Sequence, residues 1–346
     1  MKKLFVLGAA VVAFASCTND QVLDSVQPVQ NAIGFYAHTN KATKAVTETT
    51  GADLTKFHVF GYYDVTAPSS TTTKVFDNVA VTKVTENDKE EWKYDGETQF
   101  WTKNMYHFAA YADQNTPTQL SKDEVSFVDE TLTFTDYTVV DAKDLVADIQ
   151  HPDNRNYGAY EKKVGFSFKH LLSKIKFVVR NTSADYKMRI KSPLTISSIK
   201  QTGTCVVTSD AINWDPTEDA NLRVITAGSV NDIFAKLDED TEDDIKTSRY
   251  HFVMPQQDLA AVKFSITVEF LDDNNQVVKE KTVSGNLNPT DDLEWDPGYV
   301  YVYNISLPTS ALPIEFDVTG VDGWANYGST IELNPDDKNA QESAGE

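Results

Sequence analysis

Six histidines carry the side chains that most often bind metals or transfer protons in proteins. They are His38, His58, His107, His151, His170 and His251. They are scattered through expected strands and one connecting segment, without the spacing of metal ligands. The sequence also has no G-x-S-x-G turn, no phosphate-binding loop and no dinucleotide fingerprint. We therefore interpret the histidines as structural and expect no catalytic residue, no metal site and no cofactor.

Two other groups of residues could bind a ligand. The run DEDTEDD at residues 238–244 is acidic enough for calcium, but it lacks the glycine and the distal glutamate of an EF-hand loop. We interpret it as a solvated loop. The aromatic side chains that could stack against sugars are Trp92, Trp101, Trp214, Trp295 and Trp324. Most of them lie beside strongly alternating segments, which favours core or edge packing.

The first sixteen residues are predicted to be a secretory signal peptide. Lys2 and Lys3 form a positive start, residues 4–14 are apolar except for Gly8, and the small residues Ala15 and Ser16 follow. The apolar run is too short to remain as a membrane span, because a helix needs about 20 residues to cross a bilayer.

Cys17 follows the small residues directly, and the stretch from Phe14 to Cys17 resembles the lipobox of bacterial lipoproteins. The resemblance implies that Cys17 is acylated and becomes the N-terminus, anchored in the outer membrane and followed by a tether over residues 17–30. Three chains with about 45 methylenes would contribute more than about 30 kcal/mol, so the attachment would be lasting. The alternative is an ordinary secretory signal with an incidental cysteine.

Charge and cysteine content narrow the class of protein. The 346 residues include 52 acidic and 31 basic side chains, with a formal net charge of −21. Nucleic acid is therefore not expected as a partner, since phosphate binding needs a basic face. Only Cys205 remains besides Cys17, so no internal disulfide is expected, and stability must come from burial and hydrogen bonds.

Apolar residues alternate with polar ones along most of the chain, which predicts an all-β protein of two sandwich domains. We place the first domain at residues 31–155 and the second at residues 156–326, with a polar tail at residues 327–346. The expected strands of the first domain cover residues 31–38, 56–64, 75–84, 99–111, 126–139 and 144–149. Those of the second begin at residue 164 and include residues 194–201, 205–208, 249–254, 262–270, 277–283, 299–307 and 314–318, the last at a sheet edge.

The second domain is expected to begin with a break in its first strand. Val164, Phe166 and Phe168 occupy even positions, whereas Ile175 and Phe177 occupy odd ones. A strand cannot change faces without an extra residue, so residues 170–172 should form a bulge or a one-turn interruption.

Several stretches resemble the fimbrillin family of fimbrial subunits, the Mfa-like group. They are YHFAAYAD at residues 106–113, DLVAD at 144–148, FSFKHLLSKIKFVV at 166–179, FVMPQQ at 252–257, WDPGYVYVYNISL at 295–307 and VDGW at 321–324. The resemblance implies two β-sandwich domains of transthyretin-like Greek-key topology and export as a lipoprotein. It also implies assembly with other fimbrial subunits, as a homo- or hetero-polymer on the cell surface that supports adhesion.

The same resemblance implies that a protease cuts the loop after the first strand, and that a strand from another subunit replaces the one removed. That loop is residues 39–51, where Lys41 and Lys44 are the basic residues and no arginine is present. The candidate donor is residues 313–318 or the tail after Trp324. The competing hypothesis is a monomeric surface lipoprotein that binds a glycan or a host protein. A third hypothesis, a secreted hydrolase, is kept only as a control for the other two.

Overall fold

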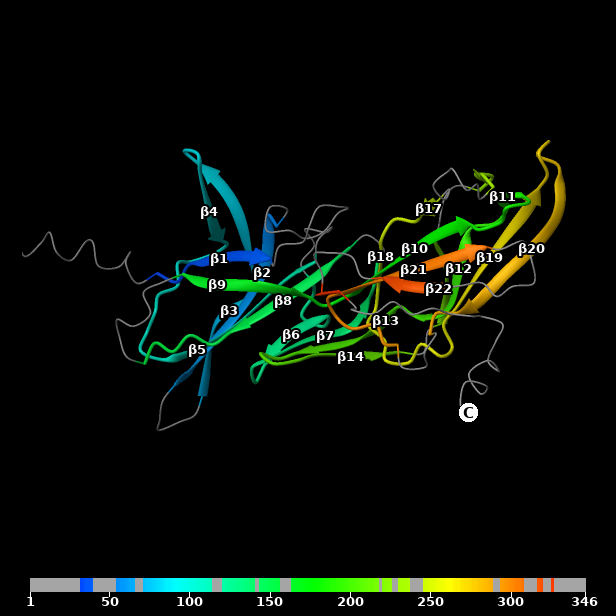
Figure 1. Cartoon of the computed structure of the whole chain (residues 1–346). Helices are drawn as coiled ribbons and strands as arrows, with labels where there is room; N and C mark the ends of the chain where they lie inside the picture. Colours follow the sequence, from blue (N-terminus) through cyan, green and yellow to red (C-terminus); the bar gives the residue numbers. More distant parts are fainter. Residues whose placement is uncertain are drawn as a thin grey trace, which may run out of the picture.

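The protein is built from β-strands. The computed structural model describes residues 32–39, 54–65, 71–113, 120–140, 143–155, 163–217, 220–225, 230–236, 245–288, 293–307, 316–319 and 325–326. Within these ranges the chain forms strands joined by turns and has no helix, which confirms the predicted all-β class (Figure 1). A helix of the length and apolarity that a bilayer crossing requires is thus also missing from these ranges. The transthyretin-like Greek-key topology stays a prediction.

The first sheet has seven strands in the order β1-β9-β8-β5-β2-β3-β4. The strands are β1 (Phe35–Thr39), β2 (Lys56–Val65), β3 (Thr71–Glu86), β4 (Lys89–Tyr94), β5 (Met105–Asp113), β8 (Leu145–Gln150) and β9 (Val164–His170). Neighbouring strands run antiparallel, except that β1 and β9 are parallel. β1 and β4 therefore form the two edges of this sheet.

The seven-stranded sheet curves around an aromatic core, so that its two edges approach each other. The ring of Phe35 on β1 lies 5.7 Å from the ring of Tyr94 on β4. Alternate residues of β5 and β9 complete this core, among them Tyr106, Phe108 and Phe166, which are fully buried. The period-two pattern of these strands thus places one row of side chains inside the curve.

A four-stranded sheet covers the other face of the seven-stranded sheet, in the order β14-β13-β7-β6. Its strands are β6 (Val125–Val128), β7 (Thr131–Thr138), β13 (Thr202–Val207) and β14 (Ile212–Pro216). Tyr111 of β5 meets Phe134 of β7 edge to face, with ring centroids 5.6 Å apart. These two sheets therefore form the first sandwich, at the left of Figure 1.

The second sandwich packs two six-stranded sheets against each other, at the right of Figure 1. One sheet has the order β17-β10-β21-β22, with β18 beside β10 and β23 beside β21; the other has the order β15-β12-β19-β11-β16, with β20 beside β19. The strands are β10 (Ser173–Asn181), β11 (Lys187–Ile190), β12 (Leu194–Lys200), β15 (Ala220–Ile225), β16 (Ile233–Phe234), β17 (Ile245–Thr247), β18 (His251–Val253), β19 (Lys263–Leu271), β20 (Val277–Asn286), β21 (Tyr299–Leu307), β22 (Phe316–Thr319) and β23 (Ala325–Asn326). In the core, Phe177 stacks on Tyr303 at 5.3 Å, and the Trp295 Nε1–H donates to the Tyr303 hydroxyl.

The predicted break at residues 170–172 is confirmed, and its cause is a change of sheet. β9 ends at His170 in the seven-stranded sheet, and β10 begins at Ser173 in the second sandwich. Leu171 and Leu172, between the two strands, are buried in the core of the first sandwich. The odd positions of β10, such as Phe177, then enter the core of the second sandwich. The apolar residues move from even to odd positions because the chain passes from the core of the first sandwich to the core of the second.

Most expected strands differ from the observed ones by one to several residues at one or both ends, and two differ in a way that changes the arrangement of the chain. Residues 126–139 were expected to form one strand, but a turn at Asp129 and Glu130 divides them into β6 and β7. Both turn residues have a positive φ, 47° and 61°, which side chains other than glycine seldom adopt. The expected strand at residues 99–111 begins only at Met105, and Phe100 instead forms an isolated bridge with Ala32. The predicted edge position of residues 314–318 is confirmed by β22.

The division into domains at residue 155 stays a prediction, and strand pairing extends across that position. β9 pairs with β1 and β8, and β13 pairs with β7. The core between the seven-stranded and four-stranded sheets also includes Val300 and Val302 of β21. The two sandwiches therefore share packing as well as a connecting chain.

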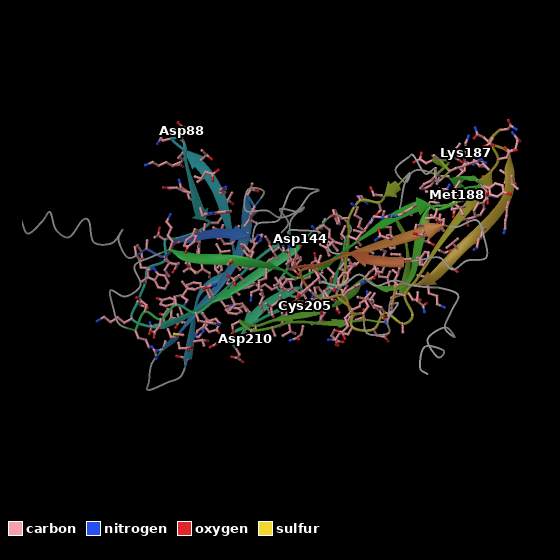
Figure 2. The ribbon with its side chains drawn as sticks, viewed as in Figure 1. Asp88, Asp144, Lys187, Met188, Cys205 and Asp210 are labelled. Atoms are coloured by element: carbon pink, nitrogen blue, oxygen red, sulfur yellow. The ribbon has the colours of Figure 1, made fainter. Side chains whose placement is uncertain are left out.

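Cys205 lies on β13, inside the core of the first sandwich (labelled in Figure 2). Its side chain is fully buried and forms no disulfide. Burial raises the pKa of the Cys205 thiol well above its ordinary range, because the thiolate would lose its hydration. The thiol therefore behaves as a small apolar group of the core.

His58 on β2 is a buried base whose pKa predicts acid sensitivity. Its ring stacks on Tyr111 at 5.3 Å, and burial, assisted by the charge of Lys56, lowers its pKa from 6.5 to about 4. The unfolded chain therefore takes up this proton more readily than the folded one. By linkage, the stability that neutral His58 allows is present above about pH 6.5 and is lost as the pH falls toward about 4.

We predict that His58→Phe reduces this loss. The free energy of unfolding of the original chain should fall, relative to the variant, by about 2 kcal/mol between about pH 7.5 and about pH 4.5. Urea unfolding at both pH values measures the difference, and the phenyl ring keeps the stacking on Tyr111. Equal losses in the two proteins would contradict the assignment to His58.

Candidate functional site

The residues predicted to be processed lie outside the described residues. These are Cys17, Lys41 and Lys44. The strand expected between Cys17 and the two lysines is present as β1. Shortly before it, Ala32 forms an isolated β-bridge with Phe100. The candidate site is therefore the position of β1 in the first sandwich.

Among the strands that the structure describes, β1 pairs with β9 alone and lies at the edge of its sheet. Phe35 to Thr39 pair in parallel with Val164 to Phe168 of β9, whose other side pairs with β8. Just before β1, the Val164 N–H donates to the Gly34 carbonyl at 2.7 Å, and the Ile33 N–H donates to the Gln99 carbonyl at 2.8 Å. The backbone of β1 is thus held mainly by β9, and its removal would leave the β9 edge unpaired.

The side chain of Phe35 fixes β1 more firmly than this pairing alone. Phe35 is 1% exposed and lies in the aromatic core of the seven-stranded sheet. Its ring centroid lies within 6.4 Å of those of Phe57, Phe76, Tyr94, Phe108 and Phe166. Edge-to-face and offset pairs of this kind stabilise a core beyond simple burial. Ile33, 2% exposed, adds a second apolar side chain to the same core.

Loss of β1 would open a groove with a definite chemistry. One wall would be the free backbone edge of β9, and the floor would be the space now filled by Phe35 and Ile33. An extended segment with apolar side chains at alternate positions could occupy such a groove by strand addition. The geometry therefore suits exchange of one strand for another.

A second surface feature lies near the junction of the two sandwiches. A cavity of about 470 Å³ is lined by Lys200, Ile212, Asn213, Trp214, Pro216, Pro255, Gln256, Gln257, Asp258, Trp295, Asp296 and Pro297. The Trp214 Nε1–H donates to the Leu171 carbonyl at 2.7 Å, which fixes the indole. Trp295 is buried and belongs to the second core. The sequence predicts that most tryptophans pack in the core or at its edge. Trp295 and Trp101 are both buried, as predicted, whereas Trp214 is partly exposed.

The structure brings together two histidines that the sequence left apart. His107 on β5 and His151 just after β8 are opposite each other across these strands, with their Nδ1 atoms 2.9 Å apart. Glu130 lies beside both rings. Spacing along one chain gave no sign of this cluster, because the pairing of β5 with β8 creates it.

Comparison with known proteins identifies the class. A family model described as fimbrillin-like matches residues 43–324. A fimbrial protein from Bacteroides vulgatus ATCC 8482 has a similar structure, with 17% identity and a TM-score of 0.52 over 86% of this chain and 99% of that one. A candidate cell adhesion protein from Bacteroides uniformis ATCC 8492 has 14% identity and a TM-score of 0.42, over 86% and 100%. No curated protein sequence matches the chain.

The match to the family model identifies the class of protein to which this all-β chain belongs. Because the family model covers most of its length, the chain belongs to the fimbrillin-like family. As a member of this family it is a cell-surface fimbrial subunit for adhesion rather than an enzyme, which confirms the resemblance found in the sequence. The likeness to the Bacteroides vulgatus protein, at its low identity, supports the fold alone.

We predict that Phe35→Ala weakens the first sandwich. The loss of the ring leaves a cavity among five aromatic neighbours, so the free energy of unfolding should fall by about 3–5 kcal/mol. Tyr36→Ala is the matched control, because Tyr36 is adjacent but 49% exposed, and it should cost less than about 1 kcal/mol. Urea unfolding of the full chain measures both values. Similar small effects from the two substitutions would show that β1 is not held by its phenylalanine.

Proposed function

We propose that the chain is the lipid-anchored precursor of a fimbrial subunit that polymerises by donor-strand exchange. In this scheme the signal peptide directs export, Cys17 is acylated, and the protein reaches the outer membrane and the cell surface. Proteolysis after Lys41 or Lys44 then separates β1, and a strand from another subunit takes its place. The observation that carries the proposal is the edge position of β1, with Phe35 buried in the core.

The order of segments along the chain supports a cut in the loop at residues 39–51. Cys17 precedes this loop, β1 ends at its first residue, Thr39, and the other described strands follow it. A cut in this loop would leave β1 attached to the lipid and held to the sandwich by noncovalent contacts, chiefly its pairing with β9 and the packing of its apolar side chains. The subunit could then leave the membrane when a competing strand displaced β1.

The donor strand must fit the groove that β1 would leave. It would need apolar residues at every second position, and a donor that repeats the observed pairing would run parallel to β9. The segment at residues 313–318 has this alternation in Ile314, Phe316 and Val318. Part of it forms β22, a four-residue edge strand that pairs with β21. A short strand at a sheet edge is suited to leave one sheet for another, and the tail after Trp324 is the other candidate.

A monomeric surface lipoprotein that binds a glycan or a host protein is the alternative function. The cavity beside Trp214 favours it, because an indole held by a hydrogen bond and bordered by Lys200, Gln257 and Asp258 offers both a stacking face and polar partners. This alternative needs no removal of β1. The state of the N-terminus on the cell surface separates the two proposals.

We predict that the double substitution Lys41→Ala, Lys44→Ala keeps the subunit uncut and monomeric on the membrane. The basic residues at which the loop would be cut are absent from this variant, so β1 would stay in place and block the groove. Intact mass and N-terminal sequencing of surface protein measure the outcome. The original chain should begin at Ala42 or Ala45, and the variant should retain an acylated Cys17.

The matched control for this experiment is Lys122→Ala, a single change of an exposed lysine away from the loop. It should leave cleavage and fibre formation unchanged. Normal fibres from the double variant would remove the loop from the mechanism. An acylated Cys17 on every molecule of the original chain would instead favour the monomeric alternative.

A further inference from the structure

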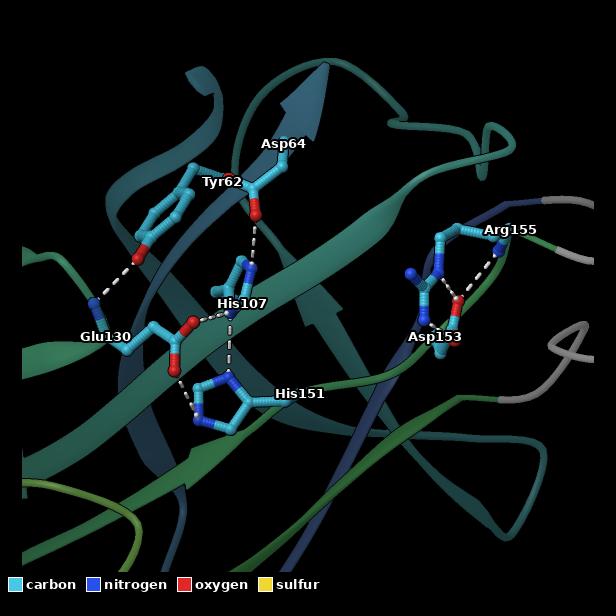
Figure 3. A network of polar contacts seen from close by, with 7 residues as sticks. All are labelled: Tyr62, Asp64, His107, Glu130, His151, Asp153 and Arg155. Atoms are coloured by element: carbon cyan, nitrogen blue, oxygen red, sulfur yellow. Dashed lines mark hydrogen bonds and ion pairs between the residues drawn. The ribbon is translucent and has the colours of Figure 1, made fainter. Parts of the chain in front are cut away.

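Two histidines and a glutamate from three separate elements meet between the two sheets of the first sandwich (Figure 3). The pairing of Phe108 with Gln150 sets the register of β5 and β8, so the next residues, His107 and His151, are opposite each other. Glu130 reaches them from the turn between β6 and β7, which belongs to the four-stranded sheet. The cluster therefore joins side chains of both sheets.

The side-chain atoms in this cluster are close enough to share one ion. The two Nδ1 atoms are 2.9 Å apart, and Glu130 Oε1 lies 3.2 Å from His107 Nδ1. Glu130 Oε2 lies 3.8 Å from His151 Nε2. One potential ligand atom from each residue can be chosen so that all three lie within 4.8 Å of one another.

The hydrogen bonds around His107 leave an excess of acceptors in this cluster. His107 Nε2 lies 3.0 Å from Asp64 Oδ2, and its N–H donates to this carboxylate in the neutral tautomer that the contact favours. His107 Nδ1 then carries a lone pair that faces the Glu130 carboxylate, another acceptor. Within the cluster, His151 offers one N–H to these two acceptors, and the Glu130 carboxylate, which is 56% exposed, also contacts solvent. A positive centre between these atoms would satisfy all three residues.

We propose that His107, His151 and Glu130 bind one divalent first-row transition metal ion, of which Zn²⁺ is the best fit. Two imidazole nitrogens and a carboxylate oxygen form the borderline ligand set that such ions prefer, whereas Ca²⁺ and Mg²⁺ prefer oxygen alone. Bonds of about 2.0–2.1 Å in a tetrahedron place ligand atoms about 3.3 Å apart. The observed contacts at the His107 ring reach this spacing with small side-chain shifts.

The surroundings position the ligands as in known metal sites. Metal-binding histidines usually donate their second ring N–H to a carboxylate, which is the role of Asp64 toward His107. Tyr62 stacks on the His107 ring at 5.0 Å, and its hydroxyl accepts the Glu130 N–H at 2.7 Å. The ring of His107 and the backbone of Glu130 are thus both fixed by one tyrosine.

The turn that carries Glu130 is a tight hairpin. Val128 pairs with Thr131, so Asp129 and Glu130 are its two central residues, and both have the positive φ that a two-residue turn of this kind requires. The hairpin thus sets the position of Glu130 at the end of β6 and β7. A bound ion would connect the β6–β7 turn to the seven-stranded sheet and would stabilise the first sandwich by mass action.

Zinc titration of the full chain, freed of metal with EDTA, tests this proposal. Calorimetry in excess Ca²⁺, which occupies oxygen-only sites of this acidic protein, should show one strong Zn²⁺ site and a rise in Tm. Co²⁺ in place of Zn²⁺ should give the visible spectrum of a four-coordinate ion with nitrogen ligands. Glu130→Gln and His151→Gln should each weaken binding by about 10-fold or more and remove the rise in Tm.

Two further variants separate ligation from charge and from positioning. Asp129→Asn changes the net charge by the same amount as Glu130→Gln, in the same turn, and should bind Zn²⁺ like the original chain. Asp64→Asn should weaken binding by about 10- to 100-fold while the Co²⁺ spectrum keeps its form, because Asp64 orients a ligand without binding the ion. Urea unfolding confirms that each variant folds.

Two outcomes would overturn the proposal. Absence of a strong Zn²⁺ site in the folded original chain would overturn the assignment of these three residues as metal ligands. Equal Zn²⁺ affinity in the original chain, Glu130→Gln and His151→Gln would place the bound ion elsewhere. Neither result depends on cleavage or polymerisation, so the proposed function is judged separately.

Discussion

The contact of Phe35 with the aromatic core is the interaction on which the first sandwich depends. β1 is a short strand at a sheet edge, and backbone pairing on one side gives it limited stability. Its phenylalanine, however, enters a core formed by strands from the whole width of the sheet. The curve of the sheet closes around this side chain, with β4 on the far edge. The side chain of Phe35 therefore links β1, a strand at the edge of the sheet, to the aromatic core of the first sandwich.

Under the proposed strand exchange, this arrangement would allow one segment to stabilise the sandwich and still be replaced. The groove that holds β1 is defined by the edge of β9 and by apolar space, and neither requires the sequence of β1 itself. Any strand with suitable alternation could supply the same contacts, so the fold specifies a kind of segment rather than a particular one. After Leu171 and Leu172 the chain of β9 continues directly into β10 of the second sandwich. The strand that pairs with β1 is thus part of the chain that connects both sandwiches.

The sequence predicted the class and many of the strands, because alternation of apolar residues reports directly on burial. The patterns of β2, β19 and β21 are regular, and the parity change before Phe177 located the passage between sheets. Other features depend on contacts that no local pattern encodes. The turn at Asp129 and Glu130 lacks glycine and proline, so the sequence predicts one continuous strand across it. The meeting of His107 and His151 requires the register of β5 and β8, which spacing along the chain does not contain.

Cys205 has a consequence for how subunits of this protein respond to redox conditions. It is enclosed in the core, with its thiolate form strongly disfavoured, and the chain has no cysteine besides it and Cys17. A subunit released from its lipid would therefore present no reactive sulfur at its surface. Reductants and mild oxidants outside the cell would neither join nor separate such subunits. The cohesion of a fibre would then rest wholly on noncovalent contacts, indifferent to the redox conditions around it.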